Sequence, residues 1–188
     1  MLLLGSSFGK FQLMSLRTGT VIGSIVGHLI NPHKMKVDAL WCKIGGFKQP
    51  RLLLIQDIRE VSPRGVIVND IDVLVEPSEV IRLSPIIELQ FDLIGKKVIS
   101  GRLTIGKLAD YALERDGFTI QKLYVEPNIW NKVKTNRLTI DRSLIIEVSQ
   151  RFIKVRGGEI KEKKSERRPL RQSSLSSAPS FNASATEE

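Results

Sequence analysis

Four side chains between residues 28 and 42 are of types that bind metals or act as nucleophiles. They are His28, His33, Asp38 and Cys42, and the chain has no other histidine or cysteine. A strand–turn–strand path would bring His28 near Cys42 and Asp38 near His33. A zinc site, however, needs three or four ligands in tetrahedral geometry. A second copy of this segment, described below, has Tyr111, Asp116, Gln121 and Val125 at these positions.

Those four residues could not form a matching site in the second copy. We therefore predict no metal site, and we interpret Cys42 as a small core hydrophobe.

Other catalytic signatures are missing from the sequence. It has no phosphate-binding loop, no dinucleotide glycine pattern and no Ser-His-Asp order, and the glycines of "GSIVGH" lie inside a predicted strand. Asp70 and Asp72 lie on one face of an extended segment, but paired carboxylates do acid–base chemistry only in a pocket that shifts their pKa values. We interpret them as part of a solvated acidic linker, and we predict no enzyme activity, no catalytic residue and no cofactor.

Two stretches combine features of a binding surface. "NIWNKVKTNR" (128–137) places Trp130 among Lys132, Lys134 and Arg137 in a predicted loop. A tryptophan beside basic residues can stack on a base or anchor a protein partner, and the alternative is a tryptophan packed beneath its own loop. The second stretch, "KEKKSERRPLR", is either a cationic segment that finds phosphates and acidic surfaces or a solubilising tail. Its cations are Lys161, Lys163, Lys164, Arg167, Arg168 and Arg171.

The charge of the chain permits an anionic partner. Lysine and arginine number 29 against 20 acidic residues, a net charge of +9, of which residues 1–155 carry +7, 156–171 carry +4 and 172–188 carry −2. The part expected to fold is therefore itself basic, which is compatible with nucleic-acid binding.

The sequence also bears on location. A single cysteine excludes an internal disulfide and fits a reducing compartment. No apolar run approaches the roughly 20 residues of a membrane-spanning helix, and "MLLLGSSFGKF" has no basic residue before its leucines. We expect a cytoplasmic protein without a membrane segment. The cationic tail has few apolar anchors and no lipidation signal, so it does not favour membrane-surface contact either.

The chain contains an internal repeat. "IREVSPRGVIV" (58–68) returns as "IIEVSQRFIKV" (145–155), and "TGTVIGSIVGHLINPHKMKVDALWC" (18–42) aligns with "SGRLTIGKLADYALERDGFTIQKLYV" (100–125) with one extra residue in the second copy. The period of about 85 residues suits two tandem small domains.

Each copy has the residue pattern of β-strands. β-Branched residues cut by glycines predict bent or bulged strands, and "NPHK" and "ERDG" predict hairpin turns between half-buried strands. Five or six short strands per copy indicate a small barrel or sandwich. The segment 69–85 joins the copies and is expected to pack as a last strand or a turn of helix, and we expect no such appendix in the second copy.

These motifs resemble the PRC-barrel superfamily. The likeness rests on the opening strands "LRTGTVIGSIVGHLI" and "VISGRLTIGKLADYAL", the next strands "KVDALWC" and "TIQKLYVE", and the closing segments "DIREVSPRGVIV" and "SLIIEVSQRFIKV". The family includes the cytoplasmic barrel of the photosynthetic reaction centre H subunit and the C-terminal domain of the ribosome maturation factor.

The resemblance implies an all-β fold of two tandem small PRC-type β-barrels of five to six strands each. We place repeat 1 at residues 10–85, repeat 2 at 86–156, and a disordered basic, then Ser-rich, tail at 157–188. It also implies a non-catalytic binding or adaptor protein with a protein partner. The alternative is a ribosome- or RNA-associated assembly or maturation factor that uses the basic surface and tail. Fold alone does not decide between them.

Overall fold

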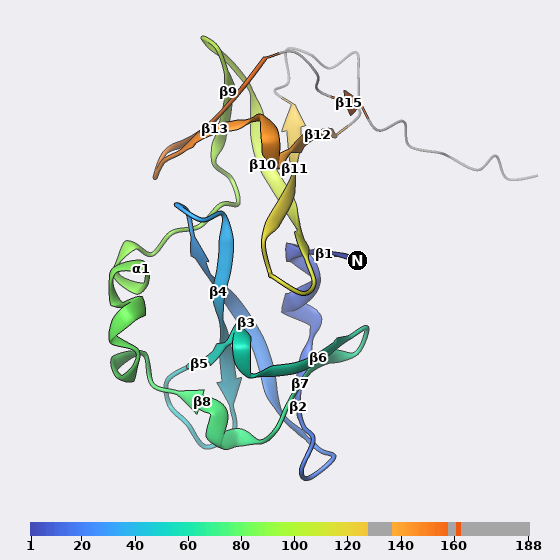
Figure 1. Cartoon of the computed structure of the whole chain (residues 1–188), viewed down its shortest axis with the longest axis vertical. Helices are drawn as coiled ribbons and strands as arrows, with labels where there is room; N and C mark the ends of the chain where they lie inside the picture. The colour runs from blue at the N-terminus through green and yellow to red at the C-terminus, as the bar shows by residue number, and fades with distance from the viewer. Residues whose placement is uncertain (128–136, 158–160, 163–188) are drawn as a thin grey trace, which may run out of the picture.

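The chain folds into two sheets that occupy opposite ends of an elongated molecule (Figure 1). The computed structural model describes residues 1–127, 137–157 and 161–162. The prediction of a β-rich fold is confirmed. Within the described residues neither sheet closes into a barrel, because each edge strand pairs on one side only. None of the helices among these residues is long and apolar enough to cross a membrane.

The first sheet has the strand order β6-β7-β2-β3-β4-β5-β8. Its strands are β2 (Gln12–Ser15), β3 (Val21–Asn31), β4 (Lys36–Ile44), β5 (Arg51–Leu54), β6 (Ile58–Ser62), β7 (Gly65–Val68) and β8 (Leu74–Val75). The closing hairpin β6–β7 returns beside the first strand, so that β7 runs parallel to β2 while all other neighbours are antiparallel.

The second sheet repeats this order element by element, as β13-β14-β9-β10-β11-β12-β15. Its strands are β9 (Lys97–Ser100), β10 (Leu103–Glu114), β11 (Ile120–Pro127), β12 (Leu138–Asp141), β13 (Ile145–Val148), β14 (Phe152–Val155) and β15 (Lys161–Glu162). Again the last hairpin strand, β14, runs parallel to the first strand, β9. The repeated unit has seven strands rather than the expected five or six. In the second copy a turn divides the predicted opening strand into β9 and β10, and in the first copy β2 precedes the predicted opening strand.

The repeated glycines allow close strand approach. Gly23 and Gly106 occupy the same position in β3 and β10. A Cβ on Gly23 would lie 2.5 Å from the Lys43 carbonyl oxygen, and a Cβ on Gly106 would overlap the carbonyl oxygen of Glu126. Just beyond each glycine the register slips by one residue, between Ile25 and Gly27 and between Leu108 and Asp110. The predicted bent, bulged strands are thus confirmed in both copies.

The segment that joins the sheets contains both a strand and a helix. It forms three short 3-10 turns, η3 (Ile71–Val73), η4 (Pro77–Glu79) and η5 (Ile81–Leu83), around strand β8 and then enters helix α1 (Ser84–Leu89). The predicted boundary at residue 85 therefore falls inside α1. The expectation that the second copy lacks such an appendix is wrong in one respect, because β15 pairs with β12 as β8 pairs with β5.

Asp70 is not part of a solvated linker. Its side chain is buried, accepts a hydrogen bond of 2.9 Å from the Ser15 hydroxyl and forms an ion pair with Arg17. Asp72, in contrast to Asp70, is exposed. The carboxylate of Asp70 thereby fixes the turn between β2 and β3, a structural role that the sequence pattern did not indicate.

The N-terminal extension of each copy packs against the sheet of the other copy. The strand β1 (Leu2–Leu4), which lies outside the predicted first repeat, pairs with β10, with Leu3 opposite Leu113. The corresponding extension of the second copy is α1, whose Ile86 and Ile87 pack near Leu29 of β3. Figure 1 shows α1 and β1 on opposite sides of the molecule.

The two sheets meet about a local pseudo-twofold axis. The hairpin tips β3–β4 and β10–β11 exchange a reciprocal pair of backbone hydrogen bonds. The Val37 amide donates to the Phe118 carbonyl (3.0 Å), and the Ile120 amide donates to the Met35 carbonyl (2.9 Å). Met35 and Phe118 hold equivalent positions and both have a positive φ, 49° and 52°. One buried core cluster accordingly includes side chains from both sheets.

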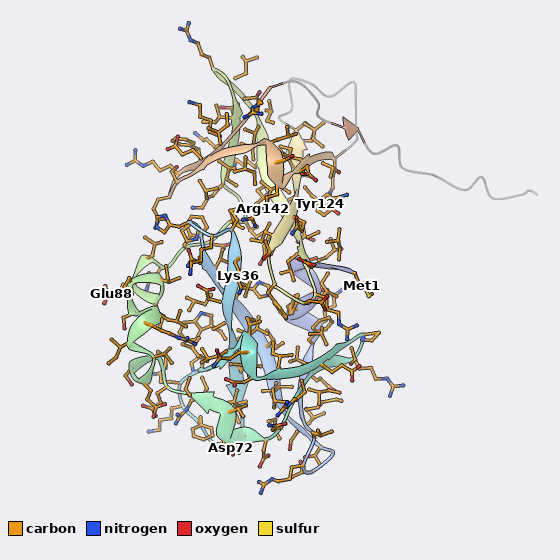
Figure 2. All side chains as sticks on the ribbon, in the orientation of Figure 1. Met1, Lys36, Asp72, Glu88, Tyr124 and Arg142 are labelled. Carbon is orange, nitrogen blue, oxygen red and sulfur yellow. The ribbon has the colours of Figure 1, made fainter. Side chains whose placement is uncertain are left out.

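Arg142 stabilises the junction between the two hairpin tips. It lies on η7 (Arg142–Leu144), at the corner between β12 and β13, and its guanidinium donates to the carbonyls of Lys34 (2.9 Å), Met35 (3.1 Å) and Ile120 (3.3 Å). Figure 2 shows Arg142 and Lys36 in the middle of the molecule, where the halves meet. A second-copy side chain thus satisfies carbonyls of both hairpin tips.

Candidate functional site: a pocket on the pseudo-twofold axis

His28 and Tyr111 are equivalent residues of the two repeats, and they contact each other. His28 lies opposite Leu40 in the β3–β4 ladder, and Tyr111 lies opposite Leu123 in the β10–β11 ladder. The Tyr111 hydroxyl is 2.6 Å from Nδ1 of His28. The Tyr111 side chain is 2% exposed, so this polar pair lies within the core that joins the sheets.

Burial moves the titration of both groups away from neutral pH. Desolvation lowers the pKa of His28 to about 4, although the carboxylates of Asp92 and Asp110 act in the opposite direction. Burial also raises the pKa of the Tyr111 hydroxyl, with a smaller contribution from the same two carboxylates. Both side chains are therefore neutral at pH 7. General acid–base catalysis needs groups that titrate near the working pH, and neither His28 nor Tyr111 titrates near neutral pH.

Because both side chains are neutral, the donor of the hydrogen bond between Tyr111 and His28 can be assigned. If Tyr111 donates to Nδ1, the imidazole proton lies on Nε2. The opposite arrangement would leave the phenolic hydrogen without an acceptor and would be the more costly one. Nε2 is buried without a hydrogen-bond partner in the described part of the chain, and the Phe8 ring packs against the imidazole edge-to-face at 5.0 Å.

A half-open pocket of about 490 Å³ lies beside this pair. Both repeats contribute to its wall at equivalent positions, among them Val26 with Ala109, Gly27 with Asp110, and His28 with Tyr111. The complete lining is Gly5, Ser6, Gly9, Val26, Gly27, His28, Ile30, Trp41, Phe91, Asp92, Ile94, Ala109, Asp110 and Tyr111. Val26 and Ile94 are 52% and 46% exposed, so apolar surface reaches the rim.

The two copies contribute different chemical groups to this pocket, and its acidic side chains, Asp92 and Asp110, both come from the second copy. Where the first copy has Gly27, the second has the buried Asp110. The Asp110 carboxylate accepts from the Ser6 amide (3.1 Å), the Ser6 hydroxyl (2.6 Å) and the Tyr111 amide (2.8 Å). The exposed Asp92 adds a second carboxylate on the same lining. Gly27 leaves room for Trp41, whose Cδ1 would stand 3.4 Å from an added Cβ.

The N-terminal turn η1 (Gly5–Lys10) covers the tyrosine side of the pocket. A Cβ on Gly5 would lie 2.6 Å from the Tyr111 ring, so only glycine fits there. Phe8 is fully buried between the repeats, and its ring lies 5.0 Å from Phe11 and 5.9 Å from Phe118. The hydrogen bonds to Ser6 therefore fix a segment that is itself anchored in the core.

The residues first considered for metal binding are dispersed. Cys42 is fully buried opposite Ile25, and burial raises the pKa of its thiol to about 12, as for an inert core residue. Asp38 accepts from the Asn31 side chain (2.9 Å), whose oxygen accepts in turn from the His33 amide (3.2 Å). Among the described residues no group of three or more His, Cys, Asp or Glu is placed to hold a metal ion.

Of the ten residues of the predicted binding surface, the structure describes Arg137 and Lys161. Arg137 is exposed immediately before β12, and the backbone of Lys161 pairs with Thr139 at the edge of the second sheet. The others lie outside the described residues: Trp130, Lys132, Lys134, Lys163, Lys164, Arg167, Arg168 and Arg171. The predicted tail at 157–188 lies outside them too, apart from Gly157 and the two residues of β15.

Part of the pocket wall, from the η1 turn and residues 91–94, lies outside the aligned repeat segments, and the sequence therefore did not predict the pocket. "FGKFQLMS" (8–15) corresponds to "LIGKKVIS" (93–100), since Phe11 and Lys96 bond to the equivalent residues Ile25 and Leu108. In this alignment Lys10 corresponds to Gly95, Leu13 to Val98 and Ser15 to Ser100. This shared spacing is the sequence signal that relates the two segments.

No protein-family model matches the chain, and no curated protein matches it.

Proposed function

We propose that this chain is a non-catalytic binding protein built from two PRC-barrel-type modules, with a protein partner that docks at the pocket on the pseudo-twofold axis. The shared strand order, the parallel return of the closing hairpin and the paired glycines support the relationship of the modules. These are features of the fold, and they do not identify a reaction.

The observation that carries the proposal is the pocket. It is half-open and mainly apolar, its rim bears the exposed side chains of Val26 and Ile94, and the aromatic side chains Trp41 and Phe91 contribute to its wall. Concave apolar surface with a few convergent polar groups is typical of binding sites. Because the neutral His28–Tyr111 pair does not titrate near pH 7, binding is favoured over acid–base catalysis.

Two variants of one strand test this proposal. Val26 and Val21 both lie on β3 and are both 52% exposed, but only Val26 lines the pocket. Proteins captured from the native cell lysate by the wild-type chain should be lost with Val26→Lys and retained with Val21→Lys. They should also persist after nuclease and at about 500 mM salt, where phosphate contacts weaken. Partners retained by Val26→Lys would contradict docking at the pocket.

One observation favours the RNA-associated alternative. On the outer face of the second sheet, Phe152 of β14, Lys97 of β9 and Lys107 of β10 lie side by side in register. An aromatic residue beside lysines on a sheet face is an arrangement that RNA-binding sheets use. The corresponding row of the first sheet is Gly65, Gln12 and Ser24, without charge. Under this alternative the captured material is nuclease-sensitive, and Lys97→Gln weakens capture.

A further inference from the structure

The pocket is negatively charged on a positively charged protein. Asp92 and Asp110 both line it, and its described lining contains no lysine or arginine. Lys96 lies outside this lining. Its ammonium lies 4.4 Å from the centre of the Phe91 ring and donates to the Gln150 carbonyl, and burial lowers its pKa while the Asp92 carboxylate acts in the opposite direction. Since the chain as a whole carries +9, the sign of this lining is a local property of the site.

The pocket also presents an aromatic surface suited to a cation. Trp41 lines it, and indole is the side chain over which cations bind best. The molecule uses the same combination in a neighbouring depression that Trp41 also lines. There the Arg51 guanidinium lies 4.4 Å from the centre of the Phe47 ring and pairs with Glu76 at 2.8 Å. That depression already contains its own cation.

We propose that the axis pocket recognises a basic side chain, lysine or arginine, of the protein partner. The aliphatic stem packs between the apolar rim and Trp41, and the charged group lies near the carboxylates of Asp92 and Asp110. The occupied depression at Arg51 is the intramolecular precedent. This inference rests on the proposed function and names the chemistry of the partner residue.

Simple amino-acid probes test the inference on the full chain. Nα-acetyl-arginine methylamide, its neutral isostere Nα-acetyl-citrulline methylamide, and Nα-acetyl-norleucine methylamide are titrated while the amide signals of Gly27 and Asp110 and the Trp41 indole signal are followed by NMR. We expect the arginine probe to shift these signals with a dissociation constant on the order of millimolar. The citrulline and norleucine probes should bind at least about fivefold more weakly.

A conservative variant assigns the effect to the carboxylate. Asp92 is exposed, and its Oδ1 accepts from the Ile94 amide (2.9 Å), a bond that the oxygen of asparagine can also accept. Asp92→Asn should weaken the arginine probe by about three- to tenfold. The control Asp116→Asn removes the same charge at an exposed hairpin turn outside the pocket and should leave binding unchanged.

The outcomes separate this inference from the proposed function. Equal binding of the arginine, citrulline and norleucine probes would overturn cation recognition and leave the pocket a binding site. Absence of arginine-induced shifts would overturn cation recognition too, while capture by Val26→Lys and Val21→Lys would still decide whether partners dock there. Equal effects of Asp92→Asn and Asp116→Asn would show that only the overall charge matters.

Discussion

The Tyr111 hydroxyl lies 2.6 Å from Nδ1 of His28, and the two residues hold the same position in two copies of one module. A duplicated strand residue therefore meets its own counterpart at the pseudo-twofold axis. In a strictly symmetric pair the two side chains would be identical. Here they have diverged into a hydrogen-bonded donor and acceptor, and a one-sided pocket lies beside them.

Removing the hydroxyl should destabilise the protein. Tyr111→Phe leaves Nδ1 of His28 without its partner in a buried setting, which typically costs about 1–3 kcal/mol. Urea unfolding of Tyr111→Phe measures the loss. Tyr124→Phe, a half-buried position on β11, is the matched control and should change the unfolding free energy by less than about 0.5 kcal/mol. Similar losses from the two variants would contradict the importance of the pair.

Stability should fall as the pH is lowered from 6.5 toward 4. The folded pKa of His28, about 4, is below its ordinary value of 6.5, so the unfolded chain binds the proton first. Protonation then favours unfolding, by up to about 3 kcal/mol at the low end of this range. His28→Gln, which keeps an acceptor for Tyr111, should remove this part of the pH dependence, whereas the exposed His33→Gln should retain it. An identical pH profile for wild type and His28→Gln would refute the assignment.

The repeat and its β character could be predicted from sequence, because glycines and alternating apolar residues report on local strand geometry. The pairing of Gly23 with Gly106 and of His28 with Tyr111 followed from that alignment. What the pattern could not reveal was the exchange of N-terminal extensions. One extension is the strand β1 and the other is the helix α1, so the two share little local pattern.

For the same reason Ser6 and Asp92 could not be expected at the site. The contact between Ser6 and Asp110 spans 104 residues, and no local periodicity encodes it. The charge of Asp110 likewise becomes part of a site only because Asp110 and Gly27 of the other copy line the same pocket. Long-range juxtaposition, rather than residue type, forms the pocket.

Arg142 should contribute strongly to the junction between the repeats. Arg142→Met removes charge-assisted hydrogen bonds to three carbonyls, two of them on the other copy's hairpin tip. We expect a loss of about 1.5–3 kcal/mol, together with faster amide exchange at Val37 and Ile120. Arg64→Met, at an exposed turn, is the control. Unchanged exchange at Val37 would argue against this role.

The repeated glycine should not tolerate a side chain. Gly106→Ala places a Cβ against the Glu126 carbonyl, a backbone atom that cannot move aside without distorting the sheet. We expect a destabilisation of about 2 kcal/mol or more, measured by thermal or urea unfolding. Gly45→Ala meets nothing within 4 Å and should be nearly neutral. A neutral Gly106→Ala would mean that the strands do not approach as closely as described.

Photo-crosslinking in the native cell tests most directly whether a protein partner docks at the pocket. A benzophenone amino acid replaces Val26 in one variant and Val21 in another, two equally exposed positions of β3 of which only the first lines the pocket. A protein partner docked at the pocket should give a defined protein adduct from position 26, unaffected by nuclease, and none from position 21. Adducts to RNA alone, or the same adducts from both positions, would contradict a protein partner docked on the pseudo-twofold axis.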